Sequence, residues 1–176
     1  MRKEKIMPKT LDPSRQVYMT SLQTDLGWLR PISDGNSLVR LDWNQTGWIE
    51  QDRPDDVSRE TKSQLQAFFS GHLQQFVLPL APIGKSATGR YWLSIMAKIP
   101  YGTVVSYAEF ARFAGKPKAA RAAGLICANN PIPIIYPCHR VIRTDGKLGG
   151  YGAGSDHQPT HPNNLARKAA LIKLES

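Results

Sequence analysis

Residues 106–141 read SYAEFARFAGKPKAARAAGLICANNPIPIIYPCHRV, and this stretch decides how the C-terminal half of the chain folds. It opens with Ser106 and Glu109 at the S-x-x-E spacing of a capping box, which starts a helix. Gly115 suits the end of that helix, and Pro117 suits the first position of the next one. Two helices joined by so short a turn indicate a helix-turn-helix, although a helical hairpin that only packs on a core has the same pattern.

The end of this stretch places a cysteine behind a rigid apolar segment. A Pro-Ile-Pro-Ile-Ile run over residues 131–135 leads to Cys138. A thiol attacks only as thiolate, and an unperturbed cysteine with a pKa of ~8.5 is only slightly ionised at neutral pH. His139 and Arg140 follow and favour the thiolate, but neighbouring side chains often point apart, so a bridging water is the better route to the histidine. Cys138 is therefore a candidate nucleophile, and the alternative is a buried structural thiol.

The positive charge is confined to one half of the chain. Residues 1–84 hold 10 Lys+Arg and 10 Asp+Glu, which gives a net charge of 0, whereas residues 85–176 hold 13 and 4, which gives 13 − 4 = +9. A basic half beside a neutral half indicates an anionic partner, and nucleic acid is the usual one. A merely soluble basic surface has the same composition.

The N-terminal half has the patterns of a small sheet followed by a helix. Short alternating runs between turn signals predict strands over residues 17–22, 27–32 and 37–43, and an apolar stripe predicts a helix over 58–70. Two prolines mark residues 78–85 as the best linker, and a second helical pattern covers 90–99.

These elements predict two parts of different fold class. We expect an α/β (α+β) N-terminal lobe with a small sheet and a helix over residues 17–80, after a disordered segment over 1–16. A mainly helical C-terminal domain with the helix-turn-helix is expected over 86–176.

The composition excludes several classes of protein. No stretch approaches the ~20 apolar residues of a membrane span, and the charged first residues lack the apolar core of a secretory signal. We expect a cytoplasmic monomer without a membrane partner. The 2 cysteines, Cys127 and Cys138, are too few for a disulfide framework or a zinc site, so we expect free thiols, no metal and no cofactor.

The motifs resemble those of one known family. Pro137-Cys-His-Arg-Val141, preceded by Asn-Pro-x-Pro-Ile from Asn130, closely resembles the active-site signature of the bacterial-type O6-alkylguanine-DNA alkyltransferases. The resemblance extends over 88–151, resumes at the C-terminal helix and is weaker over 17–50. It implies a DNA repair protein that flips O6-alkylguanine out of double-stranded DNA and transfers the alkyl group, typically methyl, irreversibly to Cys138. Use of O4-alkylthymine stays open.

The resemblance also implies a role for each matching residue. Cys138 accepts the alkyl group, His139 deprotonates it through a water, and Glu175 orients the histidine. Asn130 braces the turn before the active-site strand. Tyr107 assists rotation of the base and hydrogen-bonds the flipped guanine.

A second set of matching residues is implied to contact DNA and to form the pocket. Arg121 is implied to enter the base stack where the guanine left. The other residues expected to contact DNA are Lys118, Tyr107 and Arg140. The residues expected to line the substrate pocket are Pro133, Val141, Gly149, Tyr151 and Gly152.

Other interpretations stay open for parts of this assignment. Glu175 is penultimate and suits a solvated helix end, Asn130 suits a helix C-cap, and Tyr107 suits a core aromatic position. Residues 154–164 form a longer link than is usual for the family, and we expect an exposed loop there. The residues expected to be structural or on the surface are Cys127, His72, His157 and His161. A non-enzymatic helix-turn-helix protein that binds alkyl lesions is the alternative function, although such relatives have tryptophan in place of the cysteine.

Overall fold

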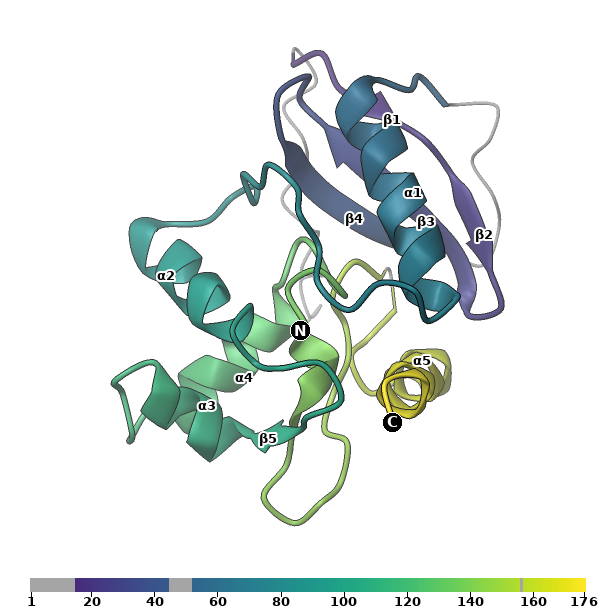
Figure 1. The fold of residues 1–176 in the computed structure, drawn as a ribbon. Coiled ribbons are helices and arrows are strands. Elements are labelled where there is room, and N and C mark those ends of the chain that lie inside the picture. Colours follow the sequence, from purple (N-terminus) through teal and green to yellow (C-terminus); the bar gives the residue numbers. More distant parts are fainter. Residues whose placement is uncertain (1–14, 45–51, 156) are drawn as a thin grey trace, which may run out of the picture.

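The computed structural model describes residues 15–44, 52–155 and 157–176, which form two packed halves (Figure 1). The first half of the chain supplies a sheet with one helix, and the second half supplies four further helices and a short second sheet. The fold is therefore mixed α and β, as the sequence predicts. The predicted disorder of residues 1–16 concerns a segment that lies, up to residue 14, outside the described residues.

Four antiparallel strands form the larger sheet. They are β1 (Tyr18–Met19), β2 (Leu22–Thr24), β3 (Gly27–Ser33) and β4 (Leu38–Asn44), and β3 pairs with each of the others. The sequence predicts a single strand over 17–22, which the structure divides between β1 and β2. The division occurs because Ser21 donates from its backbone N–H and its hydroxyl to Asp52, at 2.8 and 2.7 Å.

Helix α1 (Asp56–Phe69) packs on this sheet. Asp55 caps it by accepting from the Ser58 N–H at 2.8 Å, while the Ser58 hydroxyl accepts from the Asp55 N–H at 3.0 Å. This reciprocal cap starts the helix two residues earlier than the apolar stripe alone predicts. Leu65 and Phe68 of that stripe are fully buried.

The segment interpreted as a linker, 78–85, is held against β4. The Leu38 N–H donates to Pro79 O at 2.8 Å, and the Ala81 N–H donates back to Leu38 O at 2.9 Å. The Ile83 N–H then donates to Val39 O at 3.1 Å. The segment is therefore an edge of the sheet rather than a free spacer. Its prolines have no N–H to donate, and the N–H groups of Ala81 and Ile83 pair with β4.

The second half of the chain is mainly helical. Its helices are α2 (Ala87–Met96), α3 (Tyr107–Phe113), α4 (Ala120–Ala128) and α5 (Pro162–Leu174), with a short 3₁₀ helix, η2 (Cys138–Arg140). The strands β5 (Val105–Ser106) and β6 (Val141–Ile142) form a parallel pair. Helices α2, α3 and α4 pack on one another, and α5 packs on η2.

The α3–α4 pair follows the sequence closely at its start and departs from it in the turn. Ser106 and Glu109 form the predicted capping box, and Gly115 leaves α3 with a φ of +70°, which glycine adopts without strain. Helix α4 begins at Ala120, three residues after Pro117, and not at that proline. The intervening residues form a turn, closed by the Ala119 N–H donating to Lys116 O at 2.9 Å.

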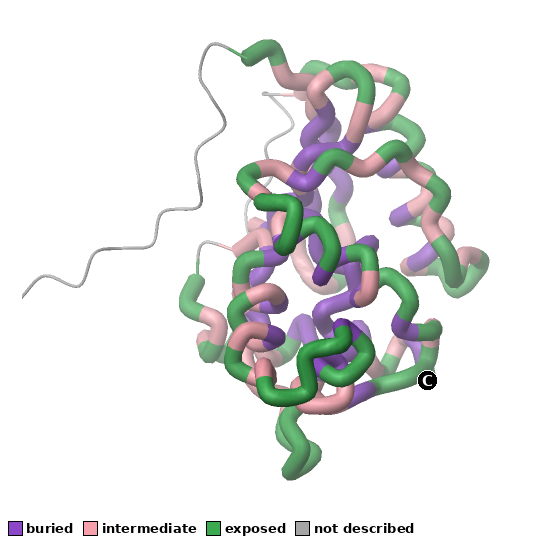
Figure 2. Tube along the Cα trace, turned by 90° about the vertical axis from the view of Figure 1, so that its left-hand side faces the viewer, coloured by how far each residue is buried: buried purple, intermediate pink, exposed green. Residues whose placement is uncertain are grey.

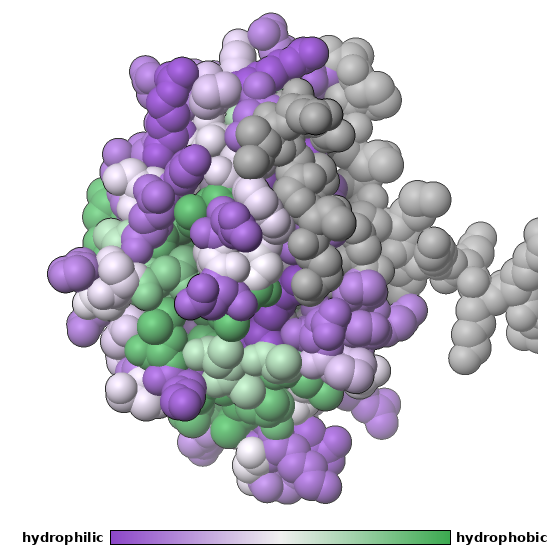
Figure 3. All heavy atoms as spheres, turned by 90° about the vertical axis from the view of Figure 1, so that its right-hand side faces the viewer, coloured by the Kyte–Doolittle hydropathy of each residue, from purple (hydrophilic) through white to green (hydrophobic). Residues whose placement is uncertain are grey.

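The two halves share a buried interior, and the exposed segments lie on the outside (Figure 2). Beside α5 they leave a hollow of about 430 Å³, whose lining includes Leu26, Phe69 and Leu174. Figure 3 shows the molecule from the right-hand side of Figure 1, where α5 lies, and apolar side chains gather there from the middle left to the lower centre of the view. Within the described ranges, no helix has both the length and the apolar character needed to cross a membrane.

Candidate active site

The turn after α4 brings Cys138 into the interior. Asn130 braces it on both sides: its side-chain oxygen accepts from the Ile132 N–H at 3.0 Å, and its amide nitrogen donates to Tyr136 O at 2.7 Å. Ile134 has a φ of 72°, a left-handed conformation that β-branched residues rarely adopt and that costs roughly 1–3 kcal/mol. Ile134 is buried at 1% exposure, so the surrounding structure holds it in this conformation.

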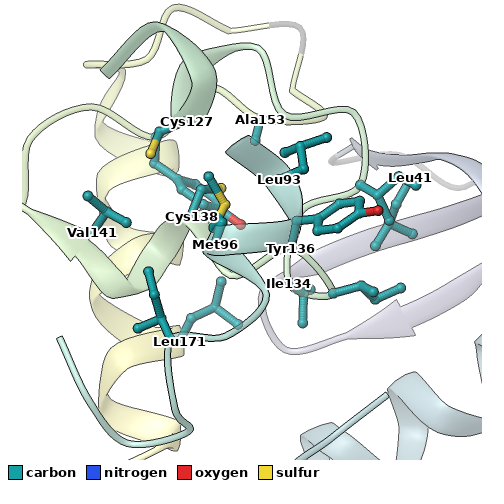
Figure 4. Close-up of a cluster of buried hydrophobic side chains, with 14 of the residues drawn as sticks. Leu41, Leu93, Met96, Cys127, Ile134, Tyr136, Cys138, Val141, Ala153 and Leu171 are labelled. Carbon is teal, nitrogen blue, oxygen red and sulfur yellow. The ribbon is translucent and has the colours of Figure 1, made fainter. Parts of the chain in front are cut away.

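The Cys138 thiol is enclosed at the start of η2, with an exposed fraction of 2% for the residue. Figure 4 shows it among the buried side chains of Met96, Val141 and Leu171. Burial raises the pKa of the thiol to about 11, although a hydrogen bond from Asn130 and the charge of Lys168 oppose the rise. The resting group is therefore a neutral thiol, which needs a base to become a nucleophile.

The next residue in the chain, His139, is the candidate for that base. The His139 ring is fully buried, and its Nε2 lies 2.7 Å from Oε1 of Glu175. A carboxylate accepts hydrogen bonds only, so Nε2 carries the proton and Nδ1 has the free lone pair. Nδ1 is buried and has no hydrogen-bonding partner among the described residues. Burial lowers the pKa of His139 and Glu175 offsets this in part, so the ring is neutral and ready to accept a proton at Nδ1.

Glu175 is held in place from three directions. Arg140 donates to both carboxylate oxygens, at 2.8 and 2.9 Å, and to Ile99 O at 2.6 Å. The Gly102 N–H donates to Oε2 at 3.2 Å. Burial alone would raise the pKa of Glu175, but the hydrogen bonds from His139 and Arg140 outweigh it and lower the pKa to about 2. Glu175 is therefore a buried carboxylate that faces the histidine, and not a solvated helix end.

This network also changes the position expected of Arg140. The resemblance groups Arg140 with the DNA-contacting residues, but only 6% of its surface is exposed and its guanidinium is used by Glu175 and Ile99. The structure therefore corrects that expectation and places Arg140 inside the site. Lys118 and Arg121 are exposed, in the α3–α4 turn and on α4.

Lys168 is a site residue that the sequence reasoning missed. It is fully buried on α5, and its ammonium donates to Val141 O at 2.6 Å, Leu148 O at 2.5 Å and Gly150 O at 3.3 Å. It thereby ties β6 to the glycine-containing loop and supplies a positive charge toward Cys138. The signal was its position seven residues, about two helical turns, before Glu175 on the same face of α5.

Tyr107 and Tyr151 lie close enough to Cys138 for its charge, in addition to burial, to raise the pKa of both hydroxyl groups. Burial raises the pKa of Tyr107 above its ordinary value, so its hydroxyl stays protonated at neutral pH. Gly149 has a φ of +69°, and a Cβ there would lie 2.9 Å from the Tyr107 oxygen, so glycine is needed for this approach. The residues Pro133, Val141 and Tyr151 are buried, and Gly152 is partly buried.

The remaining histidines and the second cysteine lie outside this network. Cys127 is buried, and burial raises the pKa of its thiol. His72 and His157 are exposed, and His161 caps α5 through Nδ1, which accepts from the Asn163 N–H at 3.3 Å. His161 is partly buried, and its ring stacks on that of His157 at 4.1 Å between centroids.

The 154–164 link is less exposed than expected. The Trp43 N–H donates to Gly154 O at 2.7 Å, and the Tyr151 N–H donates to Pro159 O at 2.8 Å. These bonds hold the link against β4 and the glycine-containing loop. Asp156 lies outside the described residues.

Comparisons with known proteins agree on one family. Residues 90–176 match the model described as 6-O-methylguanine DNA methyltransferase, DNA binding domain. A methylated-DNA–protein-cysteine methyltransferase of Methanosarcina barkeri is 49% identical over 167 residues, which cover 90% of this chain and 97% of that protein. The Mycobacterium leprae protein of the same name is 36% identical, over 90% and 92% of the two chains.

Solved structures show the same similarity. The crystal structure of Mycobacterium tuberculosis O6-methylguanine methyltransferase has a TM-score of 0.75 and 33% identity, over 91% of this chain and 93% of that one. A structure of the same organism's protein in complex with DNA has a TM-score of 0.74 and 34% identity, over 90% and 92% of the two chains.

Proposed function

Because this chain belongs to the methylated-DNA–protein-cysteine methyltransferase family and is thus a DNA repair alkyltransferase, we propose that it moves the alkyl group of O6-alkylguanine in duplex DNA onto its own Cys138. The observation that carries the proposal is the state of the buried His139 ring, which follows Cys138 in the chain. Its Nε2 lies 2.7 Å from Glu175 Oε1, and its Nδ1 has no hydrogen-bonding partner among the described residues. This is the order of nucleophile, base and orienting carboxylate.

The first step removes the thiol proton. A water between Cys138 and Nδ1 of His139 relays the proton to the ring, and Glu175 stabilises the imidazolium that forms. The hydrogen bond from Asn130 to Sγ, at 3.2 Å, and the charge of Lys168 stabilise the thiolate. These groups act against the burial that keeps the resting thiol neutral.

The second step transfers the alkyl group. The thiolate attacks the alkyl carbon in line with the bond between that carbon and O6. A C–S bond forms, the alkyl carbon–O6 bond breaks, and its electrons go to the guanine. Tyr107 donates its hydroxyl proton, which the raised pKa of the group keeps in place beforehand, to the leaving guanine, and the tyrosinate then recovers a proton from water. The product is a thioether, and the protein is consumed.

The α3–α4 pair is the proposed DNA-binding helix-turn-helix. Its exposed cations, Lys118 and Arg121, suit a phosphate backbone, and the net +9 charge of the C-terminal half suits it too. In this proposal α4 enters the minor groove, Arg121 fills the place of the flipped guanine, and the base enters the pocket near Gly149 and Tyr151. Flipping costs a few kcal/mol and is easier for a weakened base pair.

Mass spectrometry tests the function directly. After incubation with a duplex carrying O6-methylguanine, the peptide with Cys138 should gain the mass of one CH₂ unit, because a methyl group replaces the thiol hydrogen, and the peptide with Cys127 should not. A protein that binds the lesion without mass gain on Cys138 would support the non-enzymatic alternative.

Replacing Arg121 with alanine should slow repair in duplex DNA more than it weakens binding to undamaged DNA. The reason is that the arginine is proposed to act only after flipping, when it replaces stacking energy of ~1–3 kcal/mol, equivalent to about 5- to 150-fold in rate. Single-turnover transfer rates and binding titrations measure the two effects. Lys98→Ala, a change of an exposed cation just after α2, is the control. Equal losses in repair and binding would make Arg121 an ordinary phosphate contact.

A further inference from the structure

Helix α4 has one face that the described residues leave uncovered. Ala123 and Cys127 are buried and attach the helix to the core. On the opposite side Arg121 is exposed, and Leu125, one helical turn further, has an exposed fraction of 65%. The exposed face of a surface helix ordinarily has polar residues at its centre, and Leu125 instead offers an apolar side chain to a partner.

The surroundings of Leu125 leave space for that partner. A Cβ built on Gly124, on the same open side of the helix, would meet no atom within 4 Å. The small residue at this position lets an outside surface approach the helix backbone closely. Arg121 and Leu125 are therefore both exposed on a part of the helix where the glycine between them adds no side chain.

The charge around this face selects a polyanion as the partner. Lys116, Lys118 and Arg121 are all exposed at the start of α4 and in the turn before it. The sequence contains no acidic residue between Glu109 and Asp145. An apolar protein surface would gain nothing from this concentration of cations, whereas a nucleic-acid groove offers phosphates at its rim and apolar sugar and base edges on its floor.

We propose that Leu125 is a second wedge of α4, which enters the minor groove beside Arg121 and packs on the base step next to the flipped guanine. The inference rests on the proposed function, because it needs α4 to lie in a DNA groove. Proteins that bend DNA from the minor groove insert leucine, isoleucine or phenylalanine between base steps in the same way. The gain comes from burying the leucine against bases, and it exists only while the duplex is distorted.

Leu125→Ala tests the wedge. The expected result is a fall of at least about tenfold in the single-turnover rate of methyl transfer from a duplex, because the distorted duplex loses its apolar contact. Reaction with free O6-benzylguanine, which has no groove and no stack, should stay within about twofold of the unmodified protein. Leu125→Met, which keeps an apolar side chain of similar volume, should retain most of the duplex rate.

Val77→Ala is the matched control. Val77 is an aliphatic residue with an exposed fraction of 79%, and it lies after α1, where both its backbone groups bond to Gln64. Its replacement should leave both reactions unchanged.

The outcomes separate this inference from the function on which it rests. A duplex rate for Leu125→Ala equal to that of the unmodified protein overturns the wedge while the alkyltransferase function stands. Equal losses with duplex and free base also overturn it, because Leu125 would then act on the pocket or on folding. Failure of the unmodified protein to methylate Cys138 at all would instead contradict the proposed function.

Discussion

Replacing Cys138 with serine is expected to abolish alkyl transfer and to leave the affinity for DNA intact. A serine hydroxyl is a far poorer nucleophile at neutral pH, and the neutral imidazole of His139 is too weak a base to make it an alkoxide. The variant should fold, because the serine oxygen accepts the hydrogen bond that Asn130 donates to Sγ. Transfer of label from an alkylated duplex to protein measures the reaction, and gel shift measures the affinity.

The same nucleophile sets the stoichiometry. A thioether on Cys138 is chemically inert at neutral pH, and the described groups around it offer no second nucleophile placed to remove the alkyl group. Titration of lesion against protein should therefore reach a plateau at about one equivalent, however long the incubation. Cys127→Ser is the matched thiol control and should reach the same plateau. Continued turnover past one equivalent would refute the proposed mechanism.

Glu175→Gln is expected to slow transfer by about a hundredfold, within the 10²–10⁴ range typical of general base catalysis. The amide keeps the shape of the side chain but cannot stabilise an imidazolium at His139. Because the carboxylate stabilises the imidazolium that forms when His139 takes the thiol proton, its loss raises the apparent pKa of the Cys138 thiol, and the rate should rise only at higher pH. DNA binding should change little, because Glu175 is buried at 5% exposure.

The pH profile separates this role from a structural one. Glu175→Gln also leaves the buried Arg140 without its carboxylate, so lower thermal stability is expected and the rates must be measured on folded protein. Lys173→Gln, an exposed change on the same helix, is the control. An unchanged pH profile in folded Glu175→Gln would assign Glu175 to stability alone.

The stability of the native protein should also depend on Glu175 at acid pH. Its folded pKa of about 2 lies below the ordinary value of 4.5, so the carboxylate stabilises the fold above pH 4.5. That contribution is lost as the pH falls from 4.5 towards 2. Urea unfolding across this range should show a steeper loss for the unmodified protein than for Glu175→Gln, and parallel losses would contradict the assignment.

Some features of this protein were determined by the sequence alone. The capping box of α3 joins Ser106 to Glu109, three residues apart, so its geometry follows from local backbone preference. The Pro137–Val141 motif and the charge of the C-terminal half likewise indicated a nucleophile and an anionic partner. Such signals are read directly because the interacting groups lie within a few residues of one another, or because charge simply adds along the chain.

The tertiary structure decided everything that depends on distant partners. Glu175 meets His139 across 36 residues and Gly102 across 73, and no local pattern specifies either contact. Three further features depend on such contacts: Arg140 binds Glu175 in the interior, Lys168 donates to three backbone carbonyl groups, and residues 79–83 pair with β4. The motif specifies none of them. In each case a buried polar group is paired with a partner from another part of the chain. Burying such a group without a hydrogen bond would cost more free energy than local backbone preferences supply.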